Sequence, residues 1–142
     1  MKTTLLLRLA AILLFLHGVG HSFGALGWKH TSDATMAGTI MSMENNHFMF
    51  MGRSATLADF YDGYGISMIF VLLVLGIWLW MLANDAGNPL TKKLLVPLTG
   101  FLGITAVLEY VYFFPFAALF TALAGVLAFF ALLRLGNSPV VP

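Results

Sequence analysis

Two histidines, His17 and His21, lie four residues apart in an N-terminal segment whose other residues are mostly apolar or small. Side chains at positions i and i+4 of a helix project from one face, which is the spacing of paired histidines in helical metal sites. The intervening residues Gly18, Val19 and Gly20 do not form the HExxH motif of zinc enzymes. With a carboxylate nearby, the two imidazoles would suit metal binding, proton relay or general acid and base chemistry.

Carboxyl and phenol groups that could join these histidines occur in two further apolar segments. Asp59 and Tyr61 lie in the run ADFYDGYG at the start of one segment, and Glu109 lies near the end of the other. Because ionisable groups inside a membrane span are costly, His17 and Glu109 are candidates for a functional role. Two alternatives are open: Asp59 stabilises a helix start, and His17 and Glu109 form structural hydrogen bonds between helices.

Four apolar segments predict the elements that position these residues. A membrane-spanning helix needs about 20 apolar residues to cross the ~30 Å hydrocarbon layer. The four segments comprise residues 5–26, 60–83, 94–113 and 116–135. The whole chain is 60% hydrophobic and 9% charged, whereas soluble domains average about 25% charged residues. We therefore predict an all-α integral membrane four-helix bundle that comprises residues 1–142 as a single transmembrane domain.

Basic residues near the ends of these segments predict the orientation of the bundle. They are Lys2, Arg8, Lys92, Lys93 and Arg134. If the chain crosses the membrane four times, all of them lie on one side. The positive-inside rule then places both termini in the cytoplasm and residues 28–58 outside. The alternative is a cleavable signal peptide, with small residues at Ser22 and Gly24 before a cleavage site at Ala25.

On this topology the ionisable residues of three helices share one depth in the outer third of the membrane. At 1.5 Å per residue, His21 lies about 20 Å along its helix from Arg8. Glu109 lies about 24 Å from Lys93, measured in the same way. The segment that contains Asp59 starts at the same outer side. We therefore predict an outward-facing polar site that consists of His17, His21, Arg53, Asp59, Tyr61 and Glu109.

The outer segment contains a stripe of residues with helical spacing. The stripe consists of residues at positions i, i+4, i+7 and i+11, namely Met36, Ile40, Met43 and His47. This spacing predicts a short amphipathic helix in the outer loop. Alternatively, the methionines around His47 are soft ligands that suit Cu(I). Arg53, which precedes the second span, is a candidate partner for Asp59 or Asp62.

Two features of the composition argue against whole classes of function. The chain has no cysteine, which excludes disulfides, thiolate metal sites and a thiol nucleophile. Its net charge of +1 argues against a nucleic-acid partner, because nucleic-acid binding would need a clustered basic face.

Three short motifs lie at the ends of the predicted spans: GHSFG (residues 20–24), FMFMGRSATLADFYDGYG (residues 48–65) and YFFP (residues 112–115). With these motifs the chain resembles a family of small bacterial inner-membrane proteins, similar in layout to DoxX-like four-helix membrane proteins. The resemblance implies the bacterial inner membrane and points to Gly20, His21, Gly24, Arg53, Ser54, Asp59, Phe60, Tyr61, Gly63 and Gly65. His17, Asp62 and Glu109 lie outside this pattern, and Tyr64 stands where a phenylalanine is more usual.

Three hypotheses for the function follow. In the first, the polar site binds a small or lipid-like ligand, or a metal ion. In the second, the protein is a membrane isomerase or an oxidoreductase-linked subunit that acts on an isoprenoid or quinone. His21 would then act with Asp59 or Glu109 as acid and base. In the third, the protein is a non-catalytic accessory subunit or a homo-oligomer, and small-residue faces of the first and last spans contact the membrane-protein partner.

Overall fold

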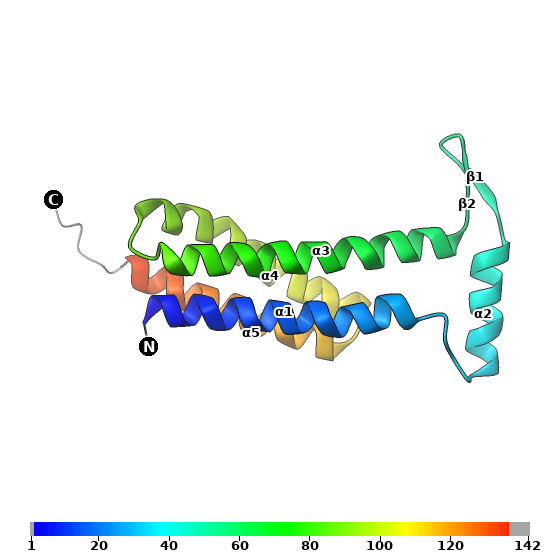
Figure 1. Cartoon of the computed structure of the whole chain (residues 1–142), viewed down its shortest axis with the longest axis horizontal. Coiled ribbons are helices and arrows are strands. Elements are labelled where there is room, and N and C mark those ends of the chain that lie inside the picture. The colour runs from blue at the N-terminus through cyan, green and yellow to red at the C-terminus, as the bar shows by residue number, and fades with distance from the viewer. Residues whose placement is uncertain (1, 137–142) are drawn as a thin grey trace. The chain divides into compact units, whose positions relative to one another are not determined.

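The computed structural model describes residues 2–136 of the chain. Five α-helices and one two-stranded antiparallel sheet lie within this part (Figure 1). In chain order they are α1 (Thr3–Gly27), α2 (Ala34–Asn45), β1 (Phe48–Phe50), β2 (Arg53–Ala55), α3 (Leu57–Asn84), α4 (Pro89–Tyr112) and α5 (Pro115–Gly136). The helices α1, α3, α4 and α5 are each long and apolar enough to cross a membrane. The predicted all-α, multi-pass membrane fold is therefore confirmed.

Local sequence explains where the last two membrane helices start. Asn88 caps α4, because its side-chain oxygen accepts a hydrogen bond from the backbone N–H of Leu90 at 2.9 Å. Pro89 follows at the start of the helix. Its missing N–H costs nothing there, because the first N–H groups of a helix have no partner within the helix. α4 ends at Tyr112, and α5 begins at Pro115 after a short turn. The proline therefore separates the two helices, as the sequence predicts.

The chain divides into two compact units. Within the described residues, the bundle unit contains residues 2–17 and 72–136, and the loop unit contains residues 18–71. The long helices α1 and α3 each contribute one part to each unit. α4 and α5 belong wholly to the bundle unit, whereas α2, β1 and β2 belong wholly to the loop unit.

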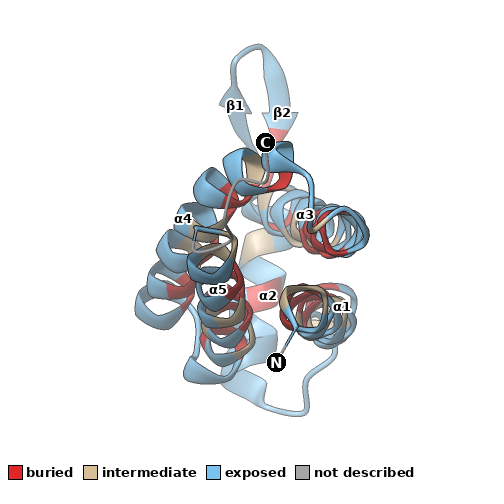
Figure 2. Cartoon of the chain, turned by 90° about the vertical axis from the view of Figure 1, so that its left-hand side faces the viewer, coloured by how far each residue is buried: buried red, intermediate tan, exposed pale blue. Residues whose placement is uncertain are grey.

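Leucines form much of the core of the bundle unit. The fully buried leucines are Leu7 and Leu14 of α1, Leu72 and Leu79 of α3, and Leu95 and Leu102 of α4. Figure 2 shows buried residues on the sides of these helices that face one another. Many other large apolar side chains of the same helices are exposed. Exposed apolar side chains are expected on helices whose outer surface faces lipid.

α5 packs through a face of small residues. Its buried residues are Ala117, Ala118, Thr121, Ala124, Gly125, Ala128 and Ala131. A Cβ atom at Gly125 would lie 3.4 Å from Leu102 Cβ and 3.8 Å from the backbone nitrogen of Gly103, so α4 approaches closely here. The small-residue face of the last span is therefore used within the chain. In the first span, a Cβ at Gly20 or Gly24 would meet no atom of the described residues within 4 Å.

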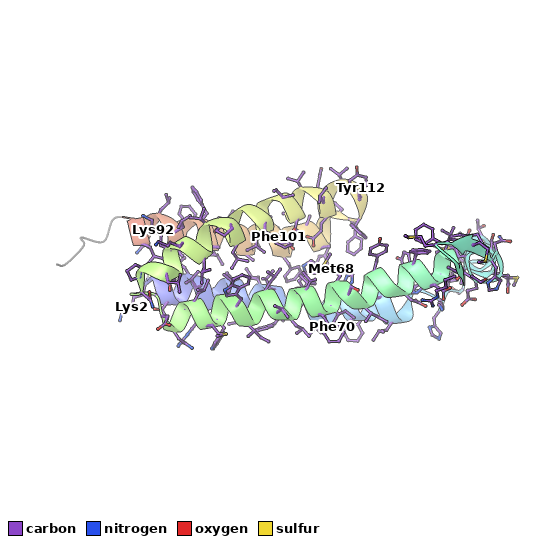
Figure 3. The ribbon with its side chains drawn as sticks, turned by 90° about the horizontal axis from the view of Figure 1, so that it is seen from above. Lys2, Met68, Phe70, Lys92, Phe101 and Tyr112 are labelled. Carbon is purple, nitrogen blue, oxygen red and sulfur yellow. The ribbon has the colours of Figure 1, made fainter. Side chains whose placement is uncertain are left out.

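The basic side chains of the bundle unit gather at one end. Figure 3 shows Lys2 and Lys92 at this end and Tyr112 at the other. Arg8 donates a hydrogen bond to Asn84 Oδ1 at 3.1 Å, which connects the first part of α1 to the last residue of α3. This grouping agrees with the predicted position of the basic residues on one side of the bundle.

A short helix begins the connection between α1 and α3 in the loop unit. Asp33 caps α2, because its side chain accepts a hydrogen bond from the backbone N–H of Met36 at 2.8 Å. Ile40 is the buried residue of this helix. The helix predicted in the outer loop is thus present. It ends at Asn45, however, so the prediction that its stripe extends to His47 is wrong.

A hairpin that the sequence did not predict completes the connection. Its turn residues Met51 and Gly52 both have positive φ angles, of 48° and 84°. Two-residue turns of this kind favour Asn-Gly or Asp-Gly, so the Met-Gly pair does not carry the usual signal. The rings of Phe48 and Phe50 lie 6.0 and 5.3 Å from the ring of Phe60, measured between centroids, and attach the hairpin to α3.

Replacing Gly125 with leucine tests the close packing of α4 against α5. The added side chain has no room beside Leu102, and overpacking of this kind costs about 1–3 kcal/mol. We expect Gly125→Leu to lower the midpoint of thermal unfolding of the full chain in detergent, measured by circular dichroism. Val126→Leu changes an exposed neighbour and should leave the midpoint unchanged. Equal midpoints for Gly125→Leu and the wild type would contradict the packing.

Candidate functional site

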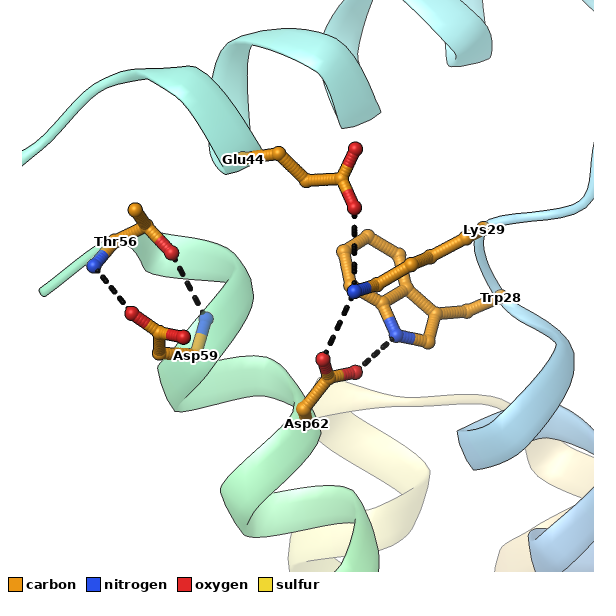
Figure 4. A network of polar contacts seen from close by, with 6 residues as sticks. All are labelled: Trp28, Lys29, Glu44, Thr56, Asp59 and Asp62. Carbon is orange, nitrogen blue, oxygen red and sulfur yellow. Dashed lines mark hydrogen bonds and ion pairs between the residues drawn. The ribbon is translucent and has the colours of Figure 1, made fainter.

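The first turn of α3 contains a reciprocal capping box. Asp59 Oδ2 accepts a hydrogen bond from the backbone N–H of Thr56 at 2.9 Å, and the Asp59 N–H donates to Thr56 Oγ1 at 3.1 Å (Figure 4). The pair satisfies both of these N–H groups at the start of the helix. The structure therefore bears out the capping alternative for Asp59. Its signal in the sequence is Thr-x-x-Asp directly before an apolar run.

Asp62, about one turn further along α3, joins three segments of the loop unit. Its Oδ1 accepts a hydrogen bond from Trp28 Nε1 at 2.7 Å, and its Oδ2 lies 3.0 Å from Lys29 Nζ. Lys29 Nζ also lies 3.2 Å from Glu44 Oε1 (Figure 4). Hydrogen bonds to two carboxylates raise the pKa of Lys29, because they stabilise its ammonium group. The bond to Asp62 has the larger effect and the bond to Glu44 the smaller. This network attaches α2 and the residues after α1 to α3.

His21 of α1 contacts α3 through a backbone hydrogen bond. Its Nε2 lies 3.1 Å from the carbonyl oxygen of Gly65. A carbonyl only accepts, so Nε2 carries the proton of this bond. A Cβ at Gly65 would lie 3.0 Å from Ala25 Cβ, so the two helices approach closely at this point. Tyr61 packs its ring against Trp28, with the ring centroids 4.5 Å apart. His21 and Tyr61, two predicted site residues, therefore both form contacts that stabilise the loop unit.

A cavity of about 380 Å³ lies beside the capping box. It is lined by Phe50, Arg53, Ala55, Asp59, Phe60, Gly63, Tyr64 and Ser67. The lining combines a guanidinium and a carboxylate with three aromatic rings. Such a set suits a ligand that is polar at one end and apolar at the other. Two predicted site residues, Arg53 and Asp59, thus line one cavity, whereas Asp62, the other suggested partner of Arg53, pairs with Lys29.

Three helices of the bundle unit each contribute one polar side chain to a buried cluster. His17 Nδ1 of α1 lies 3.0 Å from Thr121 Oγ1 of α5, within hydrogen-bonding distance. His17 Nε2 lies 3.9 Å from Glu109 Oε1 of α4. The exposed fractions of His17, Thr121 and Glu109 are 5%, 0% and 5%. The structure thus brings together the two ionisable residues predicted to lie inside the membrane.

Thr121 is a member of this cluster that the sequence analysis did not name as a site residue. The available signal was its hydroxyl, because a hydroxyl in an apolar membrane helix often forms a hydrogen bond to another helix. The ring of Phe120 lies beside the imidazole of His17, with the ring centroids 6.1 Å apart. The imidazole is therefore enclosed by a polar group and an aromatic ring of the same helix.

The described part of the chain contains no group of three or more His, Cys, Asp or Glu side chains that could hold a metal ion. The metal alternative required the imidazoles of His17 and His21 to share one ion. In the structure, His17 contacts Thr121 and His21 contacts the Gly65 carbonyl. Each of the two imidazoles therefore lies within hydrogen-bonding distance of a different protein oxygen.

These features define an all-α, multi-pass membrane protein. It combines a four-helix bundle unit that encloses a polar cluster with a loop unit that contains a polar and aromatic cavity. Comparison with known protein families, with curated proteins and with solved structures gives no match for the chain. The two sites themselves therefore provide the indications of function.

Removing the charge of Asp62 should loosen the segment between α1 and α3. Asp62→Asn weakens the ion pair with Lys29 but keeps an oxygen that can accept from Trp28. We expect amide hydrogen exchange in α2 to become several-fold faster, with exchange in α4 and α5 unchanged. Asp85→Asn, which removes an exposed charge outside this network, is the control. Equal rates of amide hydrogen exchange in α2 for Asp62→Asn and Asp85→Asn would contradict the role of the network.

Proposed function

We propose that the protein binds an amphipathic, lipid-like molecule in the cavity of the loop unit. The observation that carries this proposal is the composition of the cavity wall, where Arg53 and Asp59 share one hollow with three aromatic rings. Small-molecule sites are typically cavities of about 300–1,000 Å³ with mostly apolar walls and a few polar groups. The volume of about 380 Å³ suits a headgroup and the first part of an apolar chain.

The length of α3 supports a ligand that lies at the membrane surface. α3 has 28 residues, which is about 42 Å at 1.5 Å per residue, whereas the hydrocarbon layer is about 30 Å thick. About 20 residues counted back from Asn84 reach Gly65, so Asp59 would lie at the level of the headgroups. At this level the Arg53 guanidinium suits a phosphate or carboxylate, and the aromatic rings suit the adjoining apolar chain.

The proposal includes an orientation in the bacterial inner membrane. The basic residues of the bundle unit lie at one end, as Figure 3 illustrates for Lys2 and Lys92. The positive-inside rule assigns this end, with both termini, to the cytoplasm. The first residues of α3 would then lie at the outer face. The resemblance to small bacterial inner-membrane, DoxX-like proteins supports the same placement.

The alternatives have less support in the geometry. The enzymatic hypothesis needs His21 beside a carboxylate to act as acid and base, whereas Nε2 of His21 is bonded to the Gly65 carbonyl. The accessory-subunit hypothesis depends in part on the small-residue face of the last span. That face is buried in the bundle unit, where Gly125 lies against Leu102. The cavity therefore favours ligand binding.

Replacing Arg53 with glutamine tests the proposal in the full-length protein. We expect native mass spectrometry of gently purified protein to detect a bound lipid with an acidic headgroup. Arg53→Gln should lower the lipid-bound fraction at least about tenfold, because a hydrogen bond to a charged group contributes about 1.5–3 kcal/mol. Lys93→Gln removes one exposed positive charge away from the cavity and should leave the bound fraction unchanged.

Two results would contradict this function. One is the absence of any bound lipid in the wild type. The other is an equal bound fraction in the wild type, Arg53→Gln and Lys93→Gln, which would mean that the adduct forms away from the cavity.

A further inference from the structure

We propose that His17, Thr121 and Glu109 form a proton-binding site inside the bundle unit, in which the Glu109 carboxyl gains and loses the proton. The three side chains come from α1, α5 and α4, and each is at least nine-tenths buried. An ionisable side chain in this position is costly to retain and marks a functional site. The cluster is separate from the lipid-binding cavity of the loop unit and does not depend on it.

One oxygen of the Glu109 carboxyl lacks a hydrogen-bond partner. Its Oε2 is buried and has no hydrogen-bond partner within residues 2–136. Its Oε1 lies 3.9 Å from His17 Nε2, beyond the range of about 2.7–3.2 Å for an N–H···O hydrogen bond. A buried carboxylate oxygen without a partner is costly, and a proton bound at this oxygen removes the cost.

Thr121 connects the two titratable groups of the cluster. Its Oγ1 lies 3.0 Å from His17 Nδ1, and its side chain also lies against the Glu109 carboxyl. A hydroxyl can accept one hydrogen bond while it donates another. Thr121 can therefore accept from the imidazole and donate to the carboxylate, which stabilises the state in which the proton has left.

The other titratable groups of the bundle unit lie away from the cluster. In its four helices they are Arg8 on α1, Lys92, Lys93, Tyr110 and Tyr112 on α4, and Arg134 on α5. Along α1, His21 lies four residues after His17, where its Nε2 bonds the Gly65 carbonyl, and Arg8 lies nine residues before His17, about 13 Å along the helix. The side chains of Tyr110 and Tyr112 are exposed, and residues 72–84 of α3 contain no titratable group. The proton affinity therefore depends mainly on the three residues of the cluster and on His21, one turn along α1.

The cluster lies close to one end of the bundle unit. Glu109 lies three residues before Tyr112, the last residue of α4, which is about 5 Å along the helix. Thr121 lies six residues after Pro115, the first residue of α5, or about 9 Å. The proton can thus exchange at the end formed by the turn between α4 and α5, opposite to the basic residues.

Dicyclohexylcarbodiimide provides a test on the full-length protein. This apolar reagent takes the proton of a buried carboxyl on one nitrogen, bonds its central carbon to the carboxyl oxygen, and rearranges to a stable N-acylurea. We expect peptide mass analysis to place the label on Glu109. Labelling should fall about tenfold per pH unit above the pH at which the proton leaves. Glu109→Gln should abolish this label.

Thr121→Val distinguishes proton binding from a purely structural role. It removes the hydroxyl at nearly constant volume, and without this donor the carboxylate is less stable, so labelling should persist to higher pH. Thr99→Val removes a hydroxyl that is bonded to the Leu95 carbonyl within α4 and is the matched control. The control should leave the pH profile of Glu109 labelling unchanged.

Three outcomes would overturn the proposal. They are the absence of label on Glu109 at every pH, labelling that does not depend on pH, and a profile that Thr121→Val leaves unchanged. Lipid binding is tested at Arg53 in the loop unit, so either proposal can fail while the other stands.

Discussion

A polar group that is shielded from water must find its hydrogen-bond partners within the protein. Lipid is as apolar as leucine, so apolar contacts alone discriminate weakly between helix arrangements in a membrane. Polar contacts between helices add the discrimination that apolar contacts lack. In the bundle unit, His17 reaches Thr121 and Glu109 on two other helices. In the loop unit, His21 reaches the Gly65 carbonyl where α1 and α3 approach closely.

The two sites differ in how water affects their energies. In the loop unit, Lys29 is exposed, so solvent weakens each of its ion pairs, and the network matters chiefly because it connects three segments. In the bundle unit, the cluster around Glu109 is nearly inaccessible to water. One unsatisfied polar atom there, Glu109 Oε2, therefore has a large effect on the free energy of the folded state. A polar contact therefore contributes more to stability in the bundle unit than in the loop unit.

The four membrane helices could be predicted closely because their signal is local. Length and apolar composition define each span, and Pro115 marks the break between the last two. The hairpin could not be predicted, because its turn uses Met51 at a positive φ angle, where asparagine or aspartate is more usual. α2 was predicted, but its end was not, because Asn45 and Asn46 gave no clear stop before His47.

The sequence by itself determined the membrane fold and identified His17 and Glu109 as ionisable residues within it. Only the tertiary structure decided which side chains meet, such as Thr121 with His17, and Lys29 rather than Arg53 with Asp62. The physical reason is that contacts between helices depend on the rotation of each helix about its axis. They also depend on how closely the backbones approach at residues such as Gly65 and Gly125, and no local pattern encodes either quantity.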